Sequence, residues 1–381
     1  MKTQIIVIGA NLLNEFNAGS MRVRNLFETI ISNNNYSVIN ILQHKEIKER
    51  KVFFSPNTMI IQQNGFLKYF KICRLLSKLK HKNQRTLIYN YCSVDNYNIL
   101  ILIWAKIIKI PIVFDIVENN HTRIDSKSAL SLLKLKFTRF CEKRLYIFAS
   151  KTFVISTNLL NLISAFSKNR FPVIHLPISV RLCEWVNNSK NDNPSKQIIF
   201  YGGSFGPKDG LKYLLEAFHN IAKEFPNIEL HMSGTGAERY IKSVIKIIND
   251  LKCKKQIVML GALSRKKYIE SVLQSDIVCM TRINSEYANY GFPFKLGEYM
   301  AAGKPIIASK VSDVELYLEH KTDAWLVMPE SSLEIEQGIS FLLNDPETRK
   351  KISLNARKKA ELFFDSINIG KKFEKEILGL F

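Results

Sequence analysis

The sequence is poor in the features that mark a disulfide scaffold, a metal centre or a membrane span. Its six cysteines form no C-x-x-C pair and have no histidine cluster nearby, so they predict buried thiols in a reducing compartment and no zinc site. The N-terminus lacks the small-residue cleavage site of a signal peptide. Lys106, Lys109 and Pro111 interrupt the longest apolar region, residues 99–117, and predict a helix and a short strand in place of a transmembrane span. We therefore expect a cytoplasmic protein.

Acidic residues are also scarce. The chain has 34 Asp and Glu against 55 Lys and Arg, a net charge of +21, which predicts phosphates, nucleic acid or an anionic membrane surface as partners. Because 46% of the residues are hydrophobic, a mainly disordered chain is excluded. The length of 381 residues is more than one hydrophobic core usually serves, so we expect two domains.

Short apolar runs of strand type alternate with amphipathic segments of helix length along the chain, as in doubly wound α/β domains with parallel sheets. The predicted strands are 4–10, 37–42, 86–91, 111–116 and 152–156, then 197–202, 228–233, 257–261, 277–281, 305–309 and 324–327. The polar, Asn-rich segment 184–196 has the composition of an exposed linker. We therefore predict two Rossmann-like domains, 1–184 and 197–364, and a C-terminal helix, 365–381, that packs back on the first.

The segment 276–309, DIVCMTRINSEYANYGFPFKLGEYMAAGKPIIAS, holds the strongest chemical signal. A buried strand leads through a polar loop into a helix that starts at about Phe294. Such a helix start presents free N–H groups and a positive dipole end to a phosphate or a sugar oxygen. Lys295 and Glu298 share a face near that start, where the cation suits a diphosphate and the carboxylate suits two ribose hydroxyls. The alternative is a solvated ion pair.

The string from Phe292 to Pro305 resembles the donor-binding signature F-P-x-K-L-x-E-Y-M-A-x-G-K-P of one branch of the retaining glycosyltransferase family 4. The resemblance implies a GT-B fold, in which two Rossmann-like domains face each other across a cleft. It implies a nucleotide-diphosphate sugar as co-substrate, with no metal and no other cofactor, and a ribose contact at Glu298. The donor-binding residues expected on this segment are Arg282, Glu286, Tyr290, Gly291, Phe292, Pro293 and Phe294.

The sequence departs from the wider family at one position. The family motif has two glutamates with seven residues between them, and Tyr290 stands where the first would be. That glutamate commonly holds donor-sugar hydroxyls, a task left to Glu286 or to Arg282 with backbone N–H groups. The chain has no D-x-D motif, which disfavours the other large glycosyltransferase fold, whose diphosphate is held through a divalent ion.

A Gly-rich turn within 198–218 is the second candidate segment. Gly202, Gly203, Gly206 and Gly210 let the backbone approach a ligand closely, and Lys208 adds a positive charge. The stretch resembles the family's first loop of the second domain, whose Arg and Lys for the diphosphate align with Ser204 and Asp209. Gly234 lies in a turn that resembles the family's G-x-G turn. Simple tight turns are the alternative for both.

Two loops of the first domain complete the predicted site. Gly19 lies in a small-residue turn that resembles the one by which the family's N-terminal domain approaches the donor phosphates, and Arg22 follows on the acceptor side. Glu118 and His121 come after the fourth strand, on a rim where titratable groups can orient or deprotonate an acceptor. The alternative for each is a solvated surface residue.

The positive charge gathers on helical segments of the first domain. In 66–82, helical spacing places Lys68, Lys71, Arg74, Lys78 and Lys82 in one stripe, and 130–148 adds five more cations. A basic amphipathic helix of this kind docks on anionic headgroups. A solvated face is one alternative and nucleic acid the other, although no helix-turn-helix, RNP-like or zinc-finger pattern accompanies the charge.

We therefore predict a retaining, metal-independent hexosyltransferase on the inner face of the membrane. It would move a sugar from a nucleotide-diphosphate sugar to a glycan or polyprenyl-linked saccharide in cell-surface polysaccharide synthesis. The residues expected to act in catalysis are Lys295, Glu298, His121 and Lys208. A non-catalytic GT-B subunit that binds nucleotide sugar is the alternative, followed by a basic nucleic-acid-binding protein.

Overall fold

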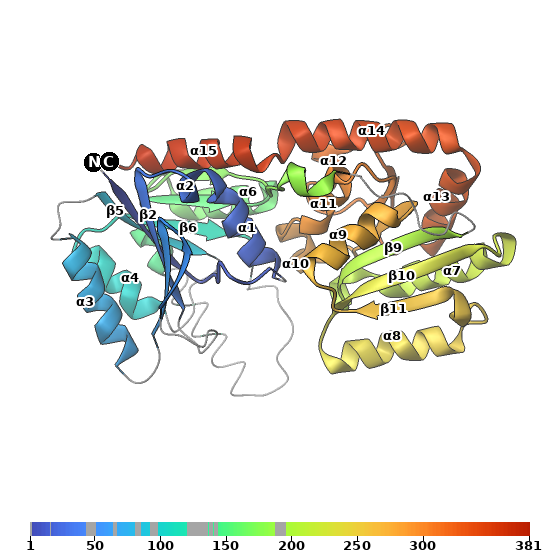
Figure 1. The fold of residues 1–381 in the computed structure, drawn as a ribbon, viewed down its shortest axis with the longest axis horizontal. Helices are drawn as coiled ribbons and strands as arrows, with labels where there is room; N and C mark the ends of the chain where they lie inside the picture. The colour runs from blue at the N-terminus through green and yellow to red at the C-terminus, as the bar shows by residue number, and fades with distance from the viewer. Residues whose placement is uncertain are drawn as a thin grey trace. The chain divides into compact units, whose positions relative to one another are not determined.

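The computed structural model describes residues 2–15, 17–42, 51–63, 67–80, 85–91, 98–119, 136, 140, 144–186 and 196–381. The chain divides into two compact units, each described here by itself (Figure 1). The first unit contains Met1–Ser179 and Ser366–Phe381, and the second contains Val180–Asp365. No helix among the described residues is long and apolar enough to cross a membrane.

The first unit is built on a sheet of order β3-β4-β2-β1-β5-β6-β7-β8. Its strands are β1 Thr3–Ile8, β2 Tyr36–Leu42, β3 Lys51–Ser55, β4 Thr58–Gln62, β5 Arg85–Tyr91, β6 Ile112–Ile116, β7 Lys151–Val154 and β8 Val173–His175. All neighbours are parallel except β3, which runs antiparallel to β4. The sequence did not predict β3, β4 and β8, and of these β3 and β8 contain no buried residue.

The helices of the first unit include one from the far end of the chain. They are α1 Ala18–Leu26, α2 Glu28–Ile31, α3 Lys68–Lys80, α4 Ile99–Ile107, α6 Thr157–Ser167 and α15 Ser366–Leu378. Phe373 of α15 contacts three rings of the unit's core, with centroid distances of 5.3 Å to Phe27, 5.5 Å to Tyr89 and 5.2 Å to Phe153. The Nζ atom of Lys151 lies 2.7 Å from Oε2 of Glu376. The last helix therefore completes the core of the first unit.

The second unit has a fully parallel sheet of order β11-β10-β9-β12-β13-β14. Its strands are β9 Gln197–Ser204, β10 Ile228–Thr235, β11 Ile257–Gly261, β12 Ile277–Met280, β13 Ile306–Ser309 and β14 Trp325–Val327. Its helices are α7 Leu211–Glu224, α8 Glu238–Asp250, α9 Arg265–Gln274, α10 Glu286–Tyr290, α11 Phe294–Ala301, α12 Val314–Tyr317, α13 Ser332–Asn344 and α14 Pro346–Phe363. In chain order the sheet reads 3-2-1-4-5-6, the doubly wound arrangement that the alternating pattern predicted.

The start of the expected linker differs from the prediction. Glu184 and Trp185 belong to a short 3-10 helix, η3 Leu182–Trp185, within the second unit. The Trp185 side chain is only 2% exposed, since its ring packs at 6.3 Å from that of Tyr268. Residues 187–195 lie outside the described part of the chain.

The expectation of buried thiols holds for only part of the cysteines. Cys253 and Cys279 are buried and Cys73 is half-buried, but Cys183 is exposed, so the prediction is wrong for Cys183. Cys183 lies on η3, where one face of the short helix meets solvent. Cys92 and Cys141 lie outside the described residues.

Candidate donor-binding site

The strand order of the second unit reverses at one point of its sheet. The chain continues from β9 to β10 on one side, whereas β12 leads to β13 on the other side. The loops after β9 and β12 therefore diverge, and in open parallel sheets ligands bind beyond the carboxyl ends of strands at such a point. Gly203 and Ser204 end β9, and Arg282 follows β12 closely. The structure thus brings together the two segments that the sequence singled out.

Lys295, on the first turn of α11, reaches the end of β9. Its Nζ donates to the hydroxyl of Tyr201 at 2.9 Å and lies 4.0 Å from the centre of that ring. The same atom lies 3.5 Å from Oδ1 of Asp209. A Cβ atom on Gly203 would come within 2.4 Å of Nζ. The glycine therefore provides the space in which the ammonium group lies.

The surroundings of Lys295 change its acidity. Burial lowers the pKa, Asp209 raises it, and Arg282 and Lys208 lower it further, so that the pKa is about 8. The lysine is therefore largely charged at neutral pH and loses its proton as the pH rises through about 8. An ammonium group that is only 9% exposed is a strong, weakly screened partner for an anion.

Asp209 and Arg282 complete the charges around Lys295. Asp209 is 1% exposed and accepts a hydrogen bond of 2.6 Å from Oγ of Ser204. Burial raises its pKa, but Lys295, Arg282 and the Ser204 hydroxyl outweigh this effect and lower the pKa below its ordinary value. Arg282 is 8% exposed, and its Nε has no hydrogen-bond partner within the described chain.

We call Lys208, Asp209, Arg282 and Lys295 the cationic cluster. Lys208 lies beside Asp209 in the 3-10 helix η4 Pro207–Asp209, and its Nζ is 4.5 Å from the ring centre of Tyr287. The backbone N–H of Ile283 donates to the carbonyl of Lys208 at 3.0 Å, so the two loops are joined directly. Because three cations face one carboxylate in this cluster, the end of the sheet has an excess of positive charge that suits a diphosphate.

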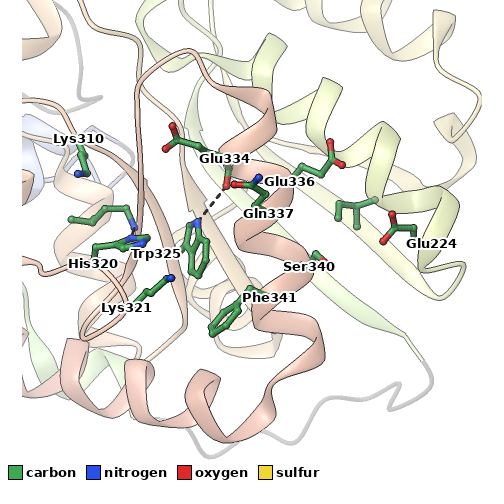
Figure 2. A pocket seen from close by; sticks show the side chains of 12 residues that line it. Glu224, Lys310, His320, Lys321, Trp325, Glu334, Glu336, Gln337, Ser340 and Phe341 are labelled. Atoms are coloured by element: carbon green, nitrogen blue, oxygen red, sulfur yellow. Dashed lines mark hydrogen bonds between the residues drawn. The ribbon is translucent and has the colours of Figure 1, made fainter.

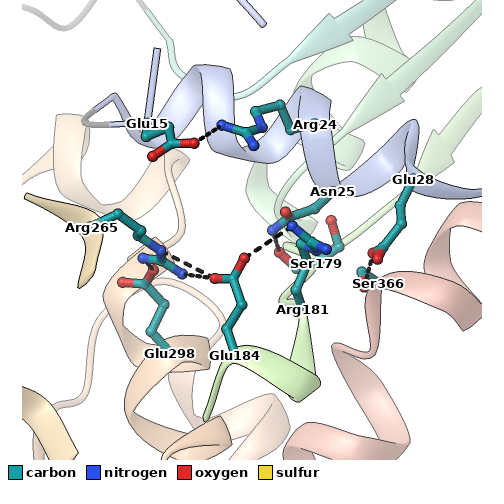
Figure 3. A network of polar contacts seen from close by, with 10 residues as sticks. All are labelled: Glu15, Arg24, Asn25, Glu28, Ser179, Arg181, Glu184, Arg265, Glu298 and Ser366. Carbon is teal, nitrogen blue, oxygen red and sulfur yellow. Dashed lines mark hydrogen bonds and ion pairs between the residues drawn. The ribbon is translucent and has the colours of Figure 1, made fainter. Parts of the chain in front are cut away.

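Glu298, about one turn after Lys295 on α11, belongs to a separate network. Its carboxylate forms an ion pair with Arg265, whose Nη2 lies 2.8 Å from Oε2 of Glu184 (Figure 3). Glu184 in turn accepts a hydrogen bond of 3.1 Å from Nη1 of Arg181, and the Arg265 guanidinium lies 5.1 Å from the ring centre of Trp185. Lys295 and Glu298 are both buried and each pairs with a different partner, so the alternative of a solvated ion pair between them is wrong.

The acidity of Glu298 reflects this network. Burial raises the pKa of the Glu298 carboxyl above its ordinary value, while Arg265 and a hydrogen bond with Tyr268 lower it without reversing the shift. The ion pair with Arg265 leaves carboxylate acceptor capacity for other donors, because a carboxylate has about four lone-pair sites. Such a buried, oriented carboxylate is suited to accept hydrogen bonds from vicinal hydroxyls.

The loop between β12 and α11 contributes less than expected at some positions. Glu286 is exposed and Tyr290 is half-buried on α10. Phe292 is 6% exposed, and its ring packs against Tyr317 at 5.4 Å and Phe364 at 5.9 Å. Phe292 is therefore part of the hydrophobic packing under the loop. Gly291 and Pro293 are also buried, whereas Phe294 is half-buried.

Gly234 is explained by the packing of the sheet. It pairs in register with Gly203 across β9 and β10, with φ of +157°. A Cβ atom at Gly234 would lie 1.7 Å from the carbonyl oxygen of Gly203. This glycine therefore permits the close approach of two strand ends, which is the tight-turn alternative given above for this position.

The predicted site residues of the first unit differ in their burial and in their contacts. Arg22 is 1% exposed and binds Asp115 through Nε at 2.8 Å and through Nη2 at 2.9 Å, so it does not offer a free guanidinium. Gly19 packs so closely on Tyr91 that a Cβ atom would lie 2.6 Å from the tyrosine hydroxyl oxygen. Glu118 is half-buried just after β6, and His121 lies outside the described residues.

Three residues of the site were not among those predicted from the sequence. Asp209, Arg265 and Glu184 supply the partners of Lys295 and Glu298, yet none belongs to the motif of α11. An acidic residue beside Lys208 in a Gly-rich turn was the available signal for Asp209. For Glu184, the polar composition of its segment predicted a linker, so its contact with Arg265 was not expected.

A hollow of about 780 Å³ lies elsewhere on the second unit (Figure 2). None of the predicted donor-site residues lines it. Trp325 donates from Nε1 to the carbonyl of Glu334 at 3.3 Å, and Nδ1 of His320 accepts from the N–H of Leu326 at 3.0 Å. The Trp325 and His320 side chains thus both bind backbone groups of the protein itself. Among the described residues no group of three or more His, Cys, Asp or Glu could hold a metal ion.

Comparison with known protein families identifies a similarity in the second unit. Residues 185–359 match the family described as "Glycosyl transferases group 1". An uncharacterized glycosyltransferase of Haemophilus influenzae is 30% identical over 169 residues, 44% of this chain and 45% of that protein. A phosphatidyl-myo-inositol mannosyltransferase of Mycobacterium leprae is 24% identical over 156 residues, 41% of this chain and 39% of that protein. The chain therefore matches less than half the length of these relatives.

Solved structures are similar to the whole chain. Anabaena HepE in complex with UDP has a TM-score of 0.73 at 16% identity, with 100% of both chains covered. Sucrose-phosphate synthase from Thermosynechococcus elongatus has a TM-score of 0.76 at 15% identity, covering 100% of this chain and 99% of that one. At such low identity these similarities show the fold. The protein has two parallel-sheet α/β domains of the GT-B class, as the sequence predicted.

Proposed function

We propose that this protein is a GT-B glycosyltransferase that uses a nucleotide-diphosphate sugar as donor. The observation that carries the proposal is the arrangement on α11. This helix holds the buried ammonium group of Lys295 and the buried carboxylate of Glu298 beside the carboxyl ends of the strands of a parallel sheet. The family match at 185–359 and the relatives that are glycosyltransferases support it. Anabaena HepE, of similar fold, was solved with UDP and with UDP-glucose, which supports a nucleotide sugar as the ligand.

In the proposed reaction each group has a separate task. Lys295, Arg282 and Lys208 hold the diphosphate, and their charge stabilises it as it leaves the sugar. Glu298, oriented by Arg265, accepts hydrogen bonds from the ribose. The bond from the anomeric carbon to the diphosphate breaks, and the acceptor oxygen bonds to that carbon on the same face, which gives retention of the anomeric configuration. The leaving phosphate takes the proton of the acceptor hydroxyl. No metal or other cofactor takes part in this scheme, and we assign the acceptor to the class of glycans or polyprenyl-linked saccharides of the cell surface.

A non-catalytic donor-binding subunit is the second candidate. It is favoured by Tyr290, which stands at the position of the first glutamate of the resembled motif. In that case the same residues would bind nucleotide sugar without transferring it.

A ligand screen followed by a transfer assay tests both candidates. Thermal shift of the full chain with UDP-, GDP- and other nucleotide sugars should reveal the donor, because a ligand at 100 times its Kd stabilises the folded state by about 2.7 kcal/mol. Release of nucleoside diphosphate from that donor with a lipid-extract acceptor would support the transferase. Binding without turnover would favour the non-catalytic subunit, and the absence of any nucleotide-dependent shift would contradict both.

A further inference from the structure

The end of β9 poses an electrostatic question. The cationic cluster contains one carboxylate, that of Asp209. A carboxylate repels a diphosphate, so Coulomb interaction with the ligand alone would favour a site without Asp209. Asp209 is 1% exposed, so it was removed from water at a cost in free energy. The contacts of Asp209 indicate what offsets that cost.

Asp209 is held on two sides. Oδ2 accepts the hydrogen bond of 2.6 Å from Ser204, and Oδ1 faces Nζ of Lys295 at 3.5 Å. Its own backbone carbonyl accepts a hydrogen bond of 3.2 Å from Oγ1 of Thr281, at the end of β12. Gly210, next in the chain, passes so close to Thr281 that a Cβ atom would lie 1.9 Å from its carbonyl oxygen. Ser204 at the end of β9 therefore holds the carboxylate, and Thr281 after β12 holds the backbone that carries it.

The ammonium of Lys295 is fixed in the same way. It lies between the carboxylate of Asp209, the hydroxyl of Tyr201 and the backbone of Gly203, which has no side chain to displace it. The other charged groups that face it, Arg282 and Lys208, are cations that favour loss of its proton. Asp209 is the one acidic group among the neighbours that act on this lysine in the described chain.

We infer that Asp209 is a positioning residue, which keeps the ammonium of Lys295 charged and directed to the diphosphate site. This inference rests on the proposed function for its ligand. A burial-driven loss of the lysine proton would remove the charge that the diphosphate needs. Asp209 opposes that loss, and its presence in an anion site thereby strengthens the binding of the anion.

The test compares Asp209→Asn with the wild type across pH, using UDP, GDP and ADP as probes in calorimetry. An opposite charge at this distance moves a pKa by about 1–3, so Lys295 of the variant should lose its proton well below pH 8. At pH 7.5 we expect the dissociation constant to rise roughly threefold or more. At pH 5.5 the variant should bind as tightly as the wild type, or more tightly, since Lys295 is charged in both. The ratio of the two constants cancels the titration of the nucleotide itself.

Two further variants sharpen the comparison. Ser204→Ala removes only the hydrogen bond to Asp209 and should shift the profile in the same direction by a smaller amount. Asp250→Asn, at an exposed position on α8, removes the same charge from the unit and should leave the profile unchanged. A variant Asp209→Asn that binds nucleotide more tightly at every pH would overturn the inference, because it would leave only the simple Coulomb effect.

A direct titration of Lys295 separates this inference from the proposed function. In protein labelled with [ε-¹³C]lysine, the signal that disappears in Lys295→Arg reports the protonation of Lys295 without any ligand. We expect its midpoint to fall in Asp209→Asn, and an unchanged midpoint would overturn the inference. If the wild type bound none of the three nucleotides, the donor-site proposal would fail, while this titration would still decide the role of Asp209.

Discussion

Glu298 is oriented by Arg265, and this contact determines how its replacement should act. Glu298→Gln preserves the shape of the side chain and leaves Arg265 paired with Glu184. We expect weaker binding of the nucleotide by about 1.5–3 kcal/mol, the range for hydrogen bonds to charged groups, because a neutral amide is a poorer acceptor for ribose hydroxyls. Calorimetry with the nucleotide identified in the ligand screen measures the loss.

Glu238→Gln serves as the control for that prediction. Glu238 is an exposed residue at the start of α8 that pairs with Lys242, and its replacement should leave the affinity as it is. Equal affinity of wild type and Glu298→Gln would show that Glu298 does not touch the nucleotide.

Arg22 and Asp115 have a structural task in the first unit. The pair is fully buried, and the hydroxyl of Tyr89 donates to Oδ2 of Asp115 at 2.5 Å. Arg22 also donates to the carbonyl oxygens of Leu176 and Pro177, so it connects α1 with β6 and the chain after β8. Asp115→Asn should lower the free energy of unfolding by about 3–5 kcal/mol, because it leaves a buried guanidinium without its counterion.

Urea unfolding followed by the fluorescence of the full chain tests this prediction. Tyr89→Phe keeps the ion pair and removes one hydrogen bond, so its loss should be only about 1 kcal/mol. A loss of the same small size in Asp115→Asn would mean that the pair contributes no more than its hydrogen bonds.

Residues of the site were predictable where one element carries the whole signal. The spacing of Lys295 and Glu298 on α11 predicted a shared helix face, and both residues are buried on that helix. Their partners were not predictable, because Asp209 and Arg265 come from elements that only the order of the strands brings near α11. Arg22 was expected on the acceptor side, but the sequence does not reveal its buried partner Asp115.

At the scale of elements, α15 is the clearest case of a helix far from its partners in sequence. Phe373 is fully buried among Phe27, Tyr89 and Phe153, although the first unit otherwise ends at Ser179. Phe373→Ala should lower the stability of the first unit by about 3–5 kcal/mol, the cost of truncating a buried aromatic ring and leaving a cavity. Thermal unfolding of the full chain measures this loss.

Leu378→Ala provides a matched control on the same helix. Leu378 is 38% exposed, so its truncation removes less buried surface and should cost much less than that of Phe373. If both variants lost the same stability, α15 would not contribute a core residue to the first unit at Phe373.

The strands show why apolar runs predict some elements well and others poorly. β9 to β14 were each predicted within about two residues. For β12 and β13 the reason is burial on both faces, which requires a continuous apolar run. β3 is an edge strand without a buried residue, in which Lys51 and Phe53 are exposed. The sequence therefore predicts buried strands of this fold better than exposed ones.

At the scale of the whole molecule, the net charge of +21 has two explanations. The cations either bind an anionic partner surface or lie on a face that water solvates. On α3, Lys71, Arg74 and Lys78 are exposed, and Lys68 is half-buried. Phe70 on the same helix is 66% exposed, and Ile107 on the neighbouring α4 is 62% exposed. Cations beside exposed apolar side chains are typical of a surface that binds an anionic bilayer.

We therefore expect the full chain to bind vesicles that contain anionic lipid. Because each cation near such a surface contributes roughly 1 kcal/mol, replacing Lys68, Lys71, Arg74 and Lys78 by Gln should release most of the protein in a sedimentation assay. Binding of the wild type should also fall steeply between about 0.1 M and 1 M salt, as the Debye length shrinks from about 10 Å to about 3 Å. Replacing Lys242, Lys246, Lys252 and Lys255 by Gln removes the same charge from exposed positions of the second unit and should retain binding. Equal release by the two variants would mean that net charge alone attracts the protein to the bilayer. If the first variant sedimented as fully as the wild type, the cations of α3 would form only a solvated face.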